Sequence, residues 1–219
     1  MSNLKGNELK NFNDKSFIVV FWERIFHYLS YISLFFVVCK IKRKKLTTVF
    51  VEKWVLFNLT FSILSSLLIY HIKIYHLAVF FIAYGLFRAF EVIVYQINVL
   101  LFDPYRSYIS GRKYRIKSPT RSVILLLHNY VELIFWYATV YISLTVLAGV
   151  ILPEVWSGYI KASAFCFVNS DLTFISKISI VQKIQLTAYF EMTGGMIMTL
   201  ISLARFIGLL PHVESVDDI

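Results

Sequence analysis

Ionisable side chains interrupt two of the long apolar segments of this chain. Arg88 and Glu91 stand three residues apart, close enough to pair along one face of a helix. His128 and Glu132 stand four residues apart in the next apolar segment, again on one helix face. Ionised groups inside a membrane are costly, so each is a functional candidate that needs a partner. Two interpretations stay open: a buried network of Arg88, Glu91 and Glu132 that locks two helices together, or a proton or ion path. His128 alone is interpreted as a satisfied polar contact.

A polar stripe follows one face of the last apolar segment. It consists of Thr187, Glu191, Gly195, Thr199 and Ser202, at spacings of four, four, four and three residues. These spacings place all five on one helix face. Small residues in such a stripe favour close packing between helices. A carboxyl among them favours the lining of a pore instead, because Glu191 needs water, a proton or a cation, and both interpretations remain open.

A short apolar run breaks into polar residues just before that last segment. The stretch FCFVNSDLTFIS covers residues 165–176. The apolar part is too short to cross a bilayer, and a full-length apolar segment follows, which is the arrangement of a pore loop. The residues expected at the constriction of such a loop are Asn169, Ser170, Asp171, Thr173 and Phe174.

Catalytic and metal-binding patterns are absent from the sequence. It contains no Ser-His pairing, no paired aspartates within the apolar segments, no His-Glu-x-x-His helix and no glycine loop for phosphate. The two cysteines, Cys39 and Cys166, lie in different segments without a metal-ligand spacing, and we interpret them as small apolar residues. We therefore expect neither an enzyme nor a bound metal or cofactor.

Composition indicates a membrane protein. Of the 219 residues, 58% are hydrophobic and 17% aromatic, and the mean hydropathy is +0.68. One compact soluble core cannot bury so much apolar surface, so the surplus faces lipid.

The net charge of +9 is concentrated in the polar interruptions between apolar segments. One basic cluster lies within residues 40–53 and another within 103–121. Basic loops are typical of the cytoplasmic side of a membrane protein and attract anionic headgroups. The candidates for contact with headgroups or an acidic cytosolic partner are Arg112, Lys113, Arg115 and Lys117. A direct nucleic-acid partner is not expected.

The positioning elements are membrane-spanning helices, because about 20 apolar residues cross a bilayer. Residues 54–70, 77–102, 122–152 and 186–210 meet this requirement. Residues 16–39 contain Glu23, Arg24 and His27 and form either an interfacial helix or a fifth span. The expected fold is an all-α integral membrane protein with about four transmembrane helices and a re-entrant pore helix and loop before the last one.

The expected organisation has five parts and a defined orientation. Both basic loops and the C-terminus are placed in the cytoplasm of an inner-membrane, multi-pass protein. The parts are a polar tail (1–15), the ambiguous helix and basic loop (16–53), a three-helix membrane region (54–152), a pore-loop and inner-helix module (153–210) and an acidic tail (211–219).

The C-terminal module carries a family resemblance. FCFVN resembles the end of a pore helix, which usually reads aromatic-Ser-aromatic-Val-Thr, and FEMTGGMIMTLISLARFIGLL resembles an inner helix with its Glu, hinge glycine and closing Ala-Arg-Phe. On these residues the chain resembles small bacterial potassium-channel-like proteins, over about a fifth of its length. RAFEVIVYQINVLLFDPYR and RSVILLLHNYVELIFWYATVY are similar to the spans that precede that module. The resemblance implies a tetramer with a loop entering from outside.

The selectivity filter departs from this family. Its glycine-rich Thr-Val/Leu-Gly-Tyr-Gly-Asp motif lets successive carbonyls face the ion. The corresponding residues here, Asp171 to Lys177, contain no glycine, and Phe174 and Ile175 are bulky. We therefore do not expect a potassium-selective carbonyl cage. Either Asp171 forms an acidic ring that favours cations, or Phe174 and Ile175 plug the axis.

Two functions follow from these alternatives. The first is a bacterial tetrameric channel-like protein whose pore is occluded or not selective for potassium. The second is a non-conducting membrane sensor or anchor that recruits a cytosolic effector through its basic loops, for example in antiviral (phage) defence or a stress response.

Overall fold

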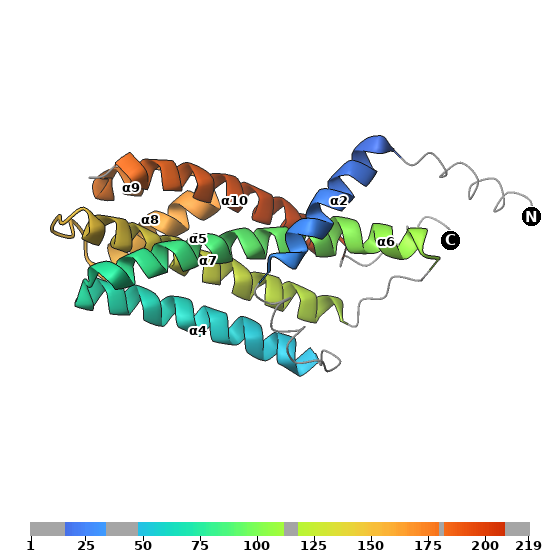
Figure 1. Cartoon of the computed structure of the whole chain (residues 1–219), viewed down its shortest axis with the longest axis horizontal. Helices are drawn as coiled ribbons and strands as arrows, with labels where there is room; N and C mark the ends of the chain where they lie inside the picture. Colours follow the sequence, from blue (N-terminus) through green and yellow to red (C-terminus); the bar gives the residue numbers. More distant parts are fainter. Residues whose placement is uncertain (1–15, 34–47, 112–117, 180–181, 209–219) are drawn as a thin grey trace, which may run out of the picture. The chain divides into compact units, whose positions relative to one another are not determined.

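The computed structural model describes residues 16–33, 48–111, 118–179 and 182–208. All regular secondary structure within these ranges is helical, which confirms the expected all-α class. The helices, labelled in Figure 1, are α2 (Phe17–Tyr31), α4 (Thr48–Ile72), α5 (Tyr75–Ile97), the π-helix η2 (Asn98–Phe102), α6 (Asp103–Ile109), α7 (Pro119–Leu147), α8 (Trp156–Asn169), α9 (Thr173–Ile178) and α10 (Gln182–Ile207).

The chain divides into two compact units, Met1–Arg43 and Lys44–Ile219. Helix α2 belongs to the first unit and the other helices to the second. At about 1.5 Å per residue, the 15 residues of α2 extend over about 22 Å, less than the roughly 30 Å of a hydrocarbon layer. Phe17, Ile18 and Trp22 on this helix are exposed.

Four helical segments within the described residues are long and apolar enough to cross a membrane. They are Val49–Ile72, Tyr75–Ile109, Thr120–Leu147 and Gln182–Ile207. This number agrees with the four clear apolar segments of the sequence. The second unit is therefore a bundle of four candidate spans to which the two shorter helices α8 and α9 are added.

Several helix boundaries differ from the expected ones. Helix α4 begins at Thr48 rather than at residue 54, so residues 48–53, expected in the first basic loop, are helical. Its Glu52 pairs with Arg121 of α7 at 2.5 Å, which accounts for a charge inside a helix. Residues 103–109, expected as part of a loop, form α6, whose Arg106 binds Asp103 at 3.0 Å and Asn98 at 2.9 Å.

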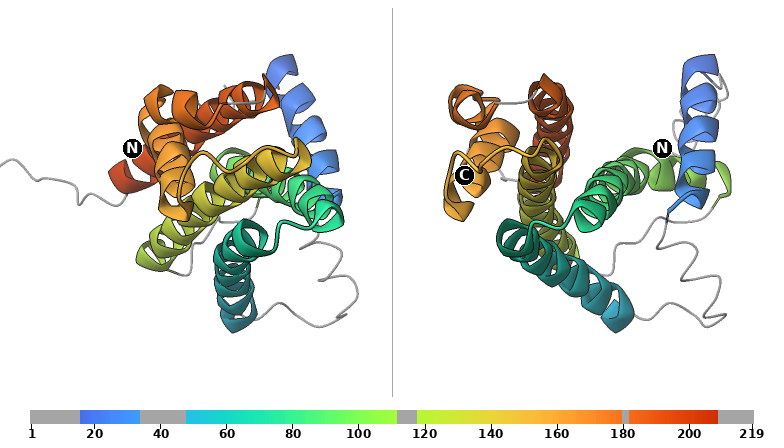
Figure 2. Two further views of the ribbon diagram at one scale, coloured as in Figure 1. Left: turned by 90° about the vertical axis from the view of Figure 1, so that its left-hand side faces the viewer. Right: turned by 60° about the vertical axis from the view of Figure 1, so that its left-hand side comes forward.

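Helix α7 lies at the centre of the second unit and contacts α4, α5, α8 and α10 (Figures 1 and 2). Its Leu133, Trp136 and Tyr141 are at most 1% exposed. The facing side of α4 carries small polar residues that let helices approach closely, namely Asn58, Ser62, Ser65 and Ser66, all buried. Ser62 donates its hydroxyl hydrogen to the Leu59 carbonyl of its own helix at 2.8 Å, so the polar group is satisfied without a partner helix.

Helices α8 and α9 form a hairpin between α7 and α10. Three parts lie at one end of the bundle, on the left of Figure 1: the link from α4 to α5, the link from α7 to α8, and helix α9. From there α8 runs along α10 in the same direction, because Ser163 contacts Glu191 and Phe167 contacts Gly195. It runs opposite to α7, since Ser163 meets Ile134 while Phe167 packs on Tyr130. The C-terminal end of α8 thus reaches the middle of α10.

Candidate functional site

A polar turn closes α8 and consists of its last residue, Asn169, together with Ser170 and Asp171. Ser170 adopts left-handed backbone angles, φ 55° and ψ 32°. Its N–H donates to the Cys166 carbonyl and the Asp171 N–H to the Phe165 carbonyl, both at 3.1 Å, so two orphan carbonyls of the helix end are satisfied. Asn169 and Ser170 are exposed and Asp171 is half-buried. Three of the five expected constriction residues therefore lie in one polar turn.

The residues expected at the place of a selectivity filter are helical rather than extended. Thr173 and Phe174 begin α9, which corrects the expectation that they belong to an open loop with the turn. The Leu172 carbonyl accepts the Ser176 N–H at 3.0 Å, so it is engaged within the chain. Phe174 packs on Phe165 with ring centroids 4.7 Å apart, and Ile175 is 2% exposed. The apolar contacts of Phe174 and Ile175 and the absence of glycine explain why the segment forms a helix.

The turn also determines the charge state of its own acid. Oδ1 of Asp171 accepts the backbone N–H of Thr173 at 2.8 Å. Hydrogen bonds from the side chain and then the backbone of Thr173 stabilise the carboxylate and lower the pKa of Asp171 below its usual value. The turn therefore carries a negative charge at neutral pH.

The stripe on α10 faces the interior of the chain in its first half. Thr187 is 8% and Glu191 0% exposed, and Gly195 is buried. A Cβ built on Gly195 would lie 2.0 Å from the Phe167 carbonyl oxygen, so a glycine is required where α8 crosses α10. In the second half, Thr199 hydrogen-bonds the Tyr130 hydroxyl at 2.9 Å, and Ser202 donates to the Met198 carbonyl at 2.8 Å. These contacts match the packing interpretation of the stripe, and the pore-lining interpretation stays a prediction.

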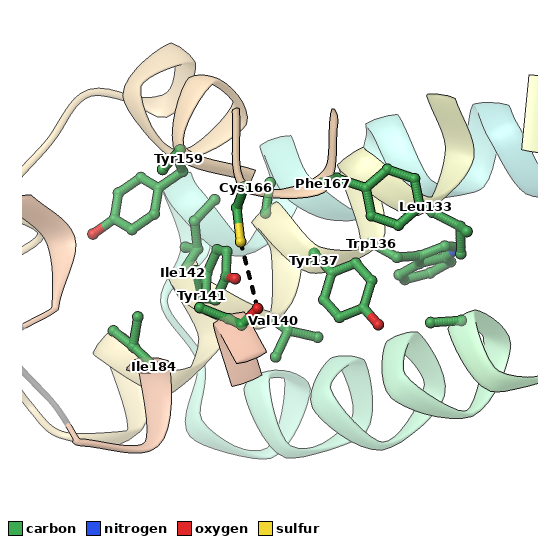
Figure 3. Packing of buried hydrophobic residues seen from close by; sticks show 14 of the residues in the cluster. Leu133, Trp136, Tyr137, Val140, Tyr141, Ile142, Tyr159, Cys166, Phe167 and Ile184 are labelled. Carbon is green, nitrogen blue, oxygen red and sulfur yellow. Dashed lines mark hydrogen bonds between the residues drawn. The ribbon is translucent and has the colours of Figure 1, made fainter. Parts of the chain in front are cut away.

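Glu191 holds the centre of this packed region. The Tyr141 hydroxyl of α7 donates to its Oε2, and the Ser163 hydroxyl of α8 lies in hydrogen-bond contact with its Oε1. The Cys166 thiol is nearby and donates to the Ala188 carbonyl at 3.4 Å. Figure 3 shows Tyr137, Tyr141 and Phe167 around Cys166 in this layer. One carboxyl thus joins α7, α8 and α10.

A second buried cluster joins α5 to α7. Arg88 donates Nε to Glu132 Oε1 at 2.7 Å and Nη2 to Oε2 at 3.2 Å, a two-bond arrangement. Its Nη1 binds Glu91 Oε2 at 2.7 Å. Trp136 Nε1 also donates to Glu132 at 3.3 Å. All three charged residues are at most 4% exposed, and together they form the interhelical network that their spacing suggested.

His128 does not join this network, contrary to its grouping with Glu132. Its Nδ1 lies 2.8 Å from the Ile124 carbonyl oxygen, one turn back in the same helix. The physical reason is rotation along α7, because Glu132 is fully buried whereas His128 is only half-buried. The other predicted contact residues, Arg112, Lys113, Arg115 and Lys117, lie outside the described residues.

Sequence reasoning missed Ser163 and Tyr141, the two partners of Glu191. Both are ordinary residues within apolar segments, and neither disturbs the hydropathy of its helix. A weak signal existed, since Ser163 stands among Ala162 and Ala164, a run of small residues that permits close packing. This run of small residues indicates close helix packing, but it does not indicate that Ser163 contacts the carboxyl of Glu191.

The fold and these clusters define a helical protein with four helices long and apolar enough to cross a membrane, a packed helix hairpin and two buried polar junctions. Comparisons of this chain with protein-family models, with curated proteins and with solved structures find no match. Among the described residues, no group of three or more His, Cys, Asp and Glu side chains is arranged to hold a metal ion.

Proposed function

We propose that this chain is the subunit of a homo-oligomeric, channel-like membrane protein whose α8–α9 hairpin re-enters the membrane and whose pore is not selective for potassium. The observation that carries this proposal is the depth of the polar turn. Phe167 touches Gly195, which lies about 20 Å along α10 from Gln182 at about 1.5 Å per residue. Asn169 and Ser170 follow, exposed at this depth.

An exposed polar turn in the middle of a bilayer must be separated from lipid by protein or by water. Irregular backbone within the hydrocarbon layer is tolerated only where protein buries it or where it lines a water-filled cavity. A charged Asp171 facing lipid would also be costly. Other copies of the chain, arranged so that their turns face a shared water-filled vestibule, remove both costs. The resemblance to potassium-channel-like proteins implies four copies and an entrance on the outer side of a bacterial inner membrane.

Cysteine accessibility tests the vestibule. In a Cys39→Ser, Cys166→Ser background, we expect Asn169→Cys to react with a membrane-impermeant thiol reagent added from outside. Met196→Cys is the matched control, because Met196 is 57% exposed and lies beside Gly195 at the same depth. If Asn169→Cys reacts no faster than Met196→Cys, the turn does not face water and the vestibule is excluded.

Conduction separates the proposed channel from a second candidate, a non-conducting membrane sensor or anchor. The buried first half of the stripe on α10 and the apolar anchoring of Phe174 and Ile175 favour this second candidate, because neither provides a polar path. In planar-bilayer recordings, a weakly selective cation current that decreases in Asp171→Asn supports the open channel. Silence in the wild type, Asp171→Asn and Phe174→Gly supports the non-conducting sensor or anchor instead. A potassium-selective current contradicts the proposed pore.

A further inference from the structure

The carboxyl of Glu191 lies in a site that the vestibule does not use. It is 0% exposed and contacts a hydroxyl from each of two neighbouring helices, Tyr141 on α7 and Ser163 on α8. Ser163 Oγ has a further contact, to the carbonyl oxygen of Ile134 at 2.8 Å. These three contacts raise the question of which atoms supply the hydrogens.

A tyrosine or serine hydroxyl has one hydrogen, and a backbone carbonyl only accepts. Tyr141 uses its hydrogen on Oε2 of Glu191. Ser163 Oγ lies 2.8 Å from the Ile134 carbonyl oxygen, which only accepts, so the hydrogen between these two atoms comes from Ser163. The contact between Ser163 and Oε1 then needs a hydrogen from the carboxyl. An ionised carboxylate only accepts, and would leave one of the two Ser163 contacts unsatisfied.

Within the described part of the chain, no positive charge faces Glu191 to compensate for ionisation. The titratable groups that face Glu191 are Tyr137 and Tyr141 from α7 and Cys166 from α8, with Asp171 of the polar turn beyond Cys166. From α5, the nearby side chain is the apolar Ile93, beside Gly194. No ion pair among the described residues includes Glu191. An unpaired carboxylate in such a site would carry a large desolvation cost.

We propose that Glu191 is an intramembrane proton-binding site, in which the neutral carboxyl donates to Ser163, accepts from Tyr141 and thereby ties the hairpin to α10 and α7. A proton fits better than a metal cation, because the oxygens are in direct hydrogen-bond contact and leave no space for an ion between them. Loss of the proton leaves a buried anion at the junction and weakens the attachment of α8. This site exists within one chain and does not depend on the vestibule or on conduction.

Infrared spectroscopy tests the proton directly. At neutral pH we expect the wild type to show a carbonyl stretching band of a protonated carboxyl, and Glu191→Gln to lose it. Glu154→Gln is the control, because Glu154 lies in the link before α8 and is not fully buried. Ser163→Ala keeps Glu191 but removes its acceptor, so the band should persist and move to higher frequency. An unchanged spectrum in Glu191→Gln, or an unshifted band in Ser163→Ala, would overturn the proposal.

Thiol labelling tests the junction itself. Cys166 is buried, so in a Cys39→Ser background its labelling by a small permeant reagent reports opening between α8 and α10. The Cys166 thiol ionises in both proteins, whereas Gln at position 191 cannot ionise. Dividing the labelling rate of the wild type by that of Glu191→Gln therefore removes the pH dependence that comes from the thiol. We expect this ratio to rise with pH, roughly tenfold for each pH unit over which opening releases the proton. A ratio that stays constant between pH 6 and about pH 10 would contradict a proton-dependent junction.

Discussion

At the scale of single residues, close contact between two helix backbones explains the residue type at position 195 better than polarity does. Gly195 belongs to the polar stripe on α10 by its spacing, but what the fold requires at this position is the absence of a side chain. The Phe167 carbonyl occupies the space of its Cβ. Because both groups belong to helix backbone, neither moves without displacing its helix.

Gly195→Ala should therefore destabilise the protein by about 1–3 kcal/mol or more, the usual range for overpacking. Unfolding of detergent-solubilised protein by denaturant would measure this loss. Gly208→Ala is the matched control, since its Cβ would meet nothing closer than 3.5 Å and should have almost no effect. Equal stability of the two variants would mean that α8 and α10 are not in backbone contact.

The buried Arg88 cluster gives a second prediction at this scale. Arg88→Met leaves Glu91 and Glu132 buried without their cation, which should cost about 3–5 kcal/mol of the free energy of unfolding. Adding Glu132→Gln to this variant removes one of the two unpaired buried carboxylates and should restore part of the lost free energy of unfolding. A double-mutant cycle measures the coupling between the two sites, and strictly additive costs would show that the pair does not interact.

At the scale of elements, hydropathy predicts which segments are helices, whereas the helix ends depend on contacts that hydropathy does not describe. Length and apolar content identified the four spans. They missed α6, because its stabilising contacts come from Arg106 reaching back to Asn98 rather than from apolar content. Residue spacing predicted that Thr187, Glu191 and Gly195 share a face, yet spacing carries no information on the neighbouring element. Only the fold shows that α8 covers this face, and so Ser163 and Tyr141 could not be predicted.

The start of α9 provides a pH-dependent prediction for an element. The carboxylate of Asp171 holds the Thr173 N–H, and its pKa is lowered by these hydrogen bonds. Since the folded pKa is the lower one, this stabilisation is fully present above the unfolded value of about 3.9 and is lost as pH falls through the folded value. An NMR titration should show the Thr173 amide shifting together with the Asp171 carboxyl below about pH 4. In Asp171→Ala that shift should disappear, and its persistence would assign the titration to another group.

At the scale of the whole molecule, the position of basic residues relative to the four candidate spans of the described residues predicts orientation. The links before α5 and before α8 lie at one end of the bundle, and the end of α6 lies at the other, flanked by Arg106 and Arg121. Positive residues beside short connections stay in the cytoplasm. The hairpin should therefore enter from the outer side, as the vestibule requires.

Two single cysteines test this orientation in intact cells, each in the Cys39→Ser, Cys166→Ser background. Ile151→Cys lies in the link before α8, where the native side chain is 89% exposed, and Ser110→Cys follows α6. An impermeant thiol reagent should label Ile151→Cys in intact cells and Ser110→Cys only after permeabilisation. The reverse pattern would place the polar turn in a cavity open to the cytoplasm. In that case Asp171 would face cytosolic ions, and the basic residues near α6 would meet the outer leaflet, which is the less favourable position for them.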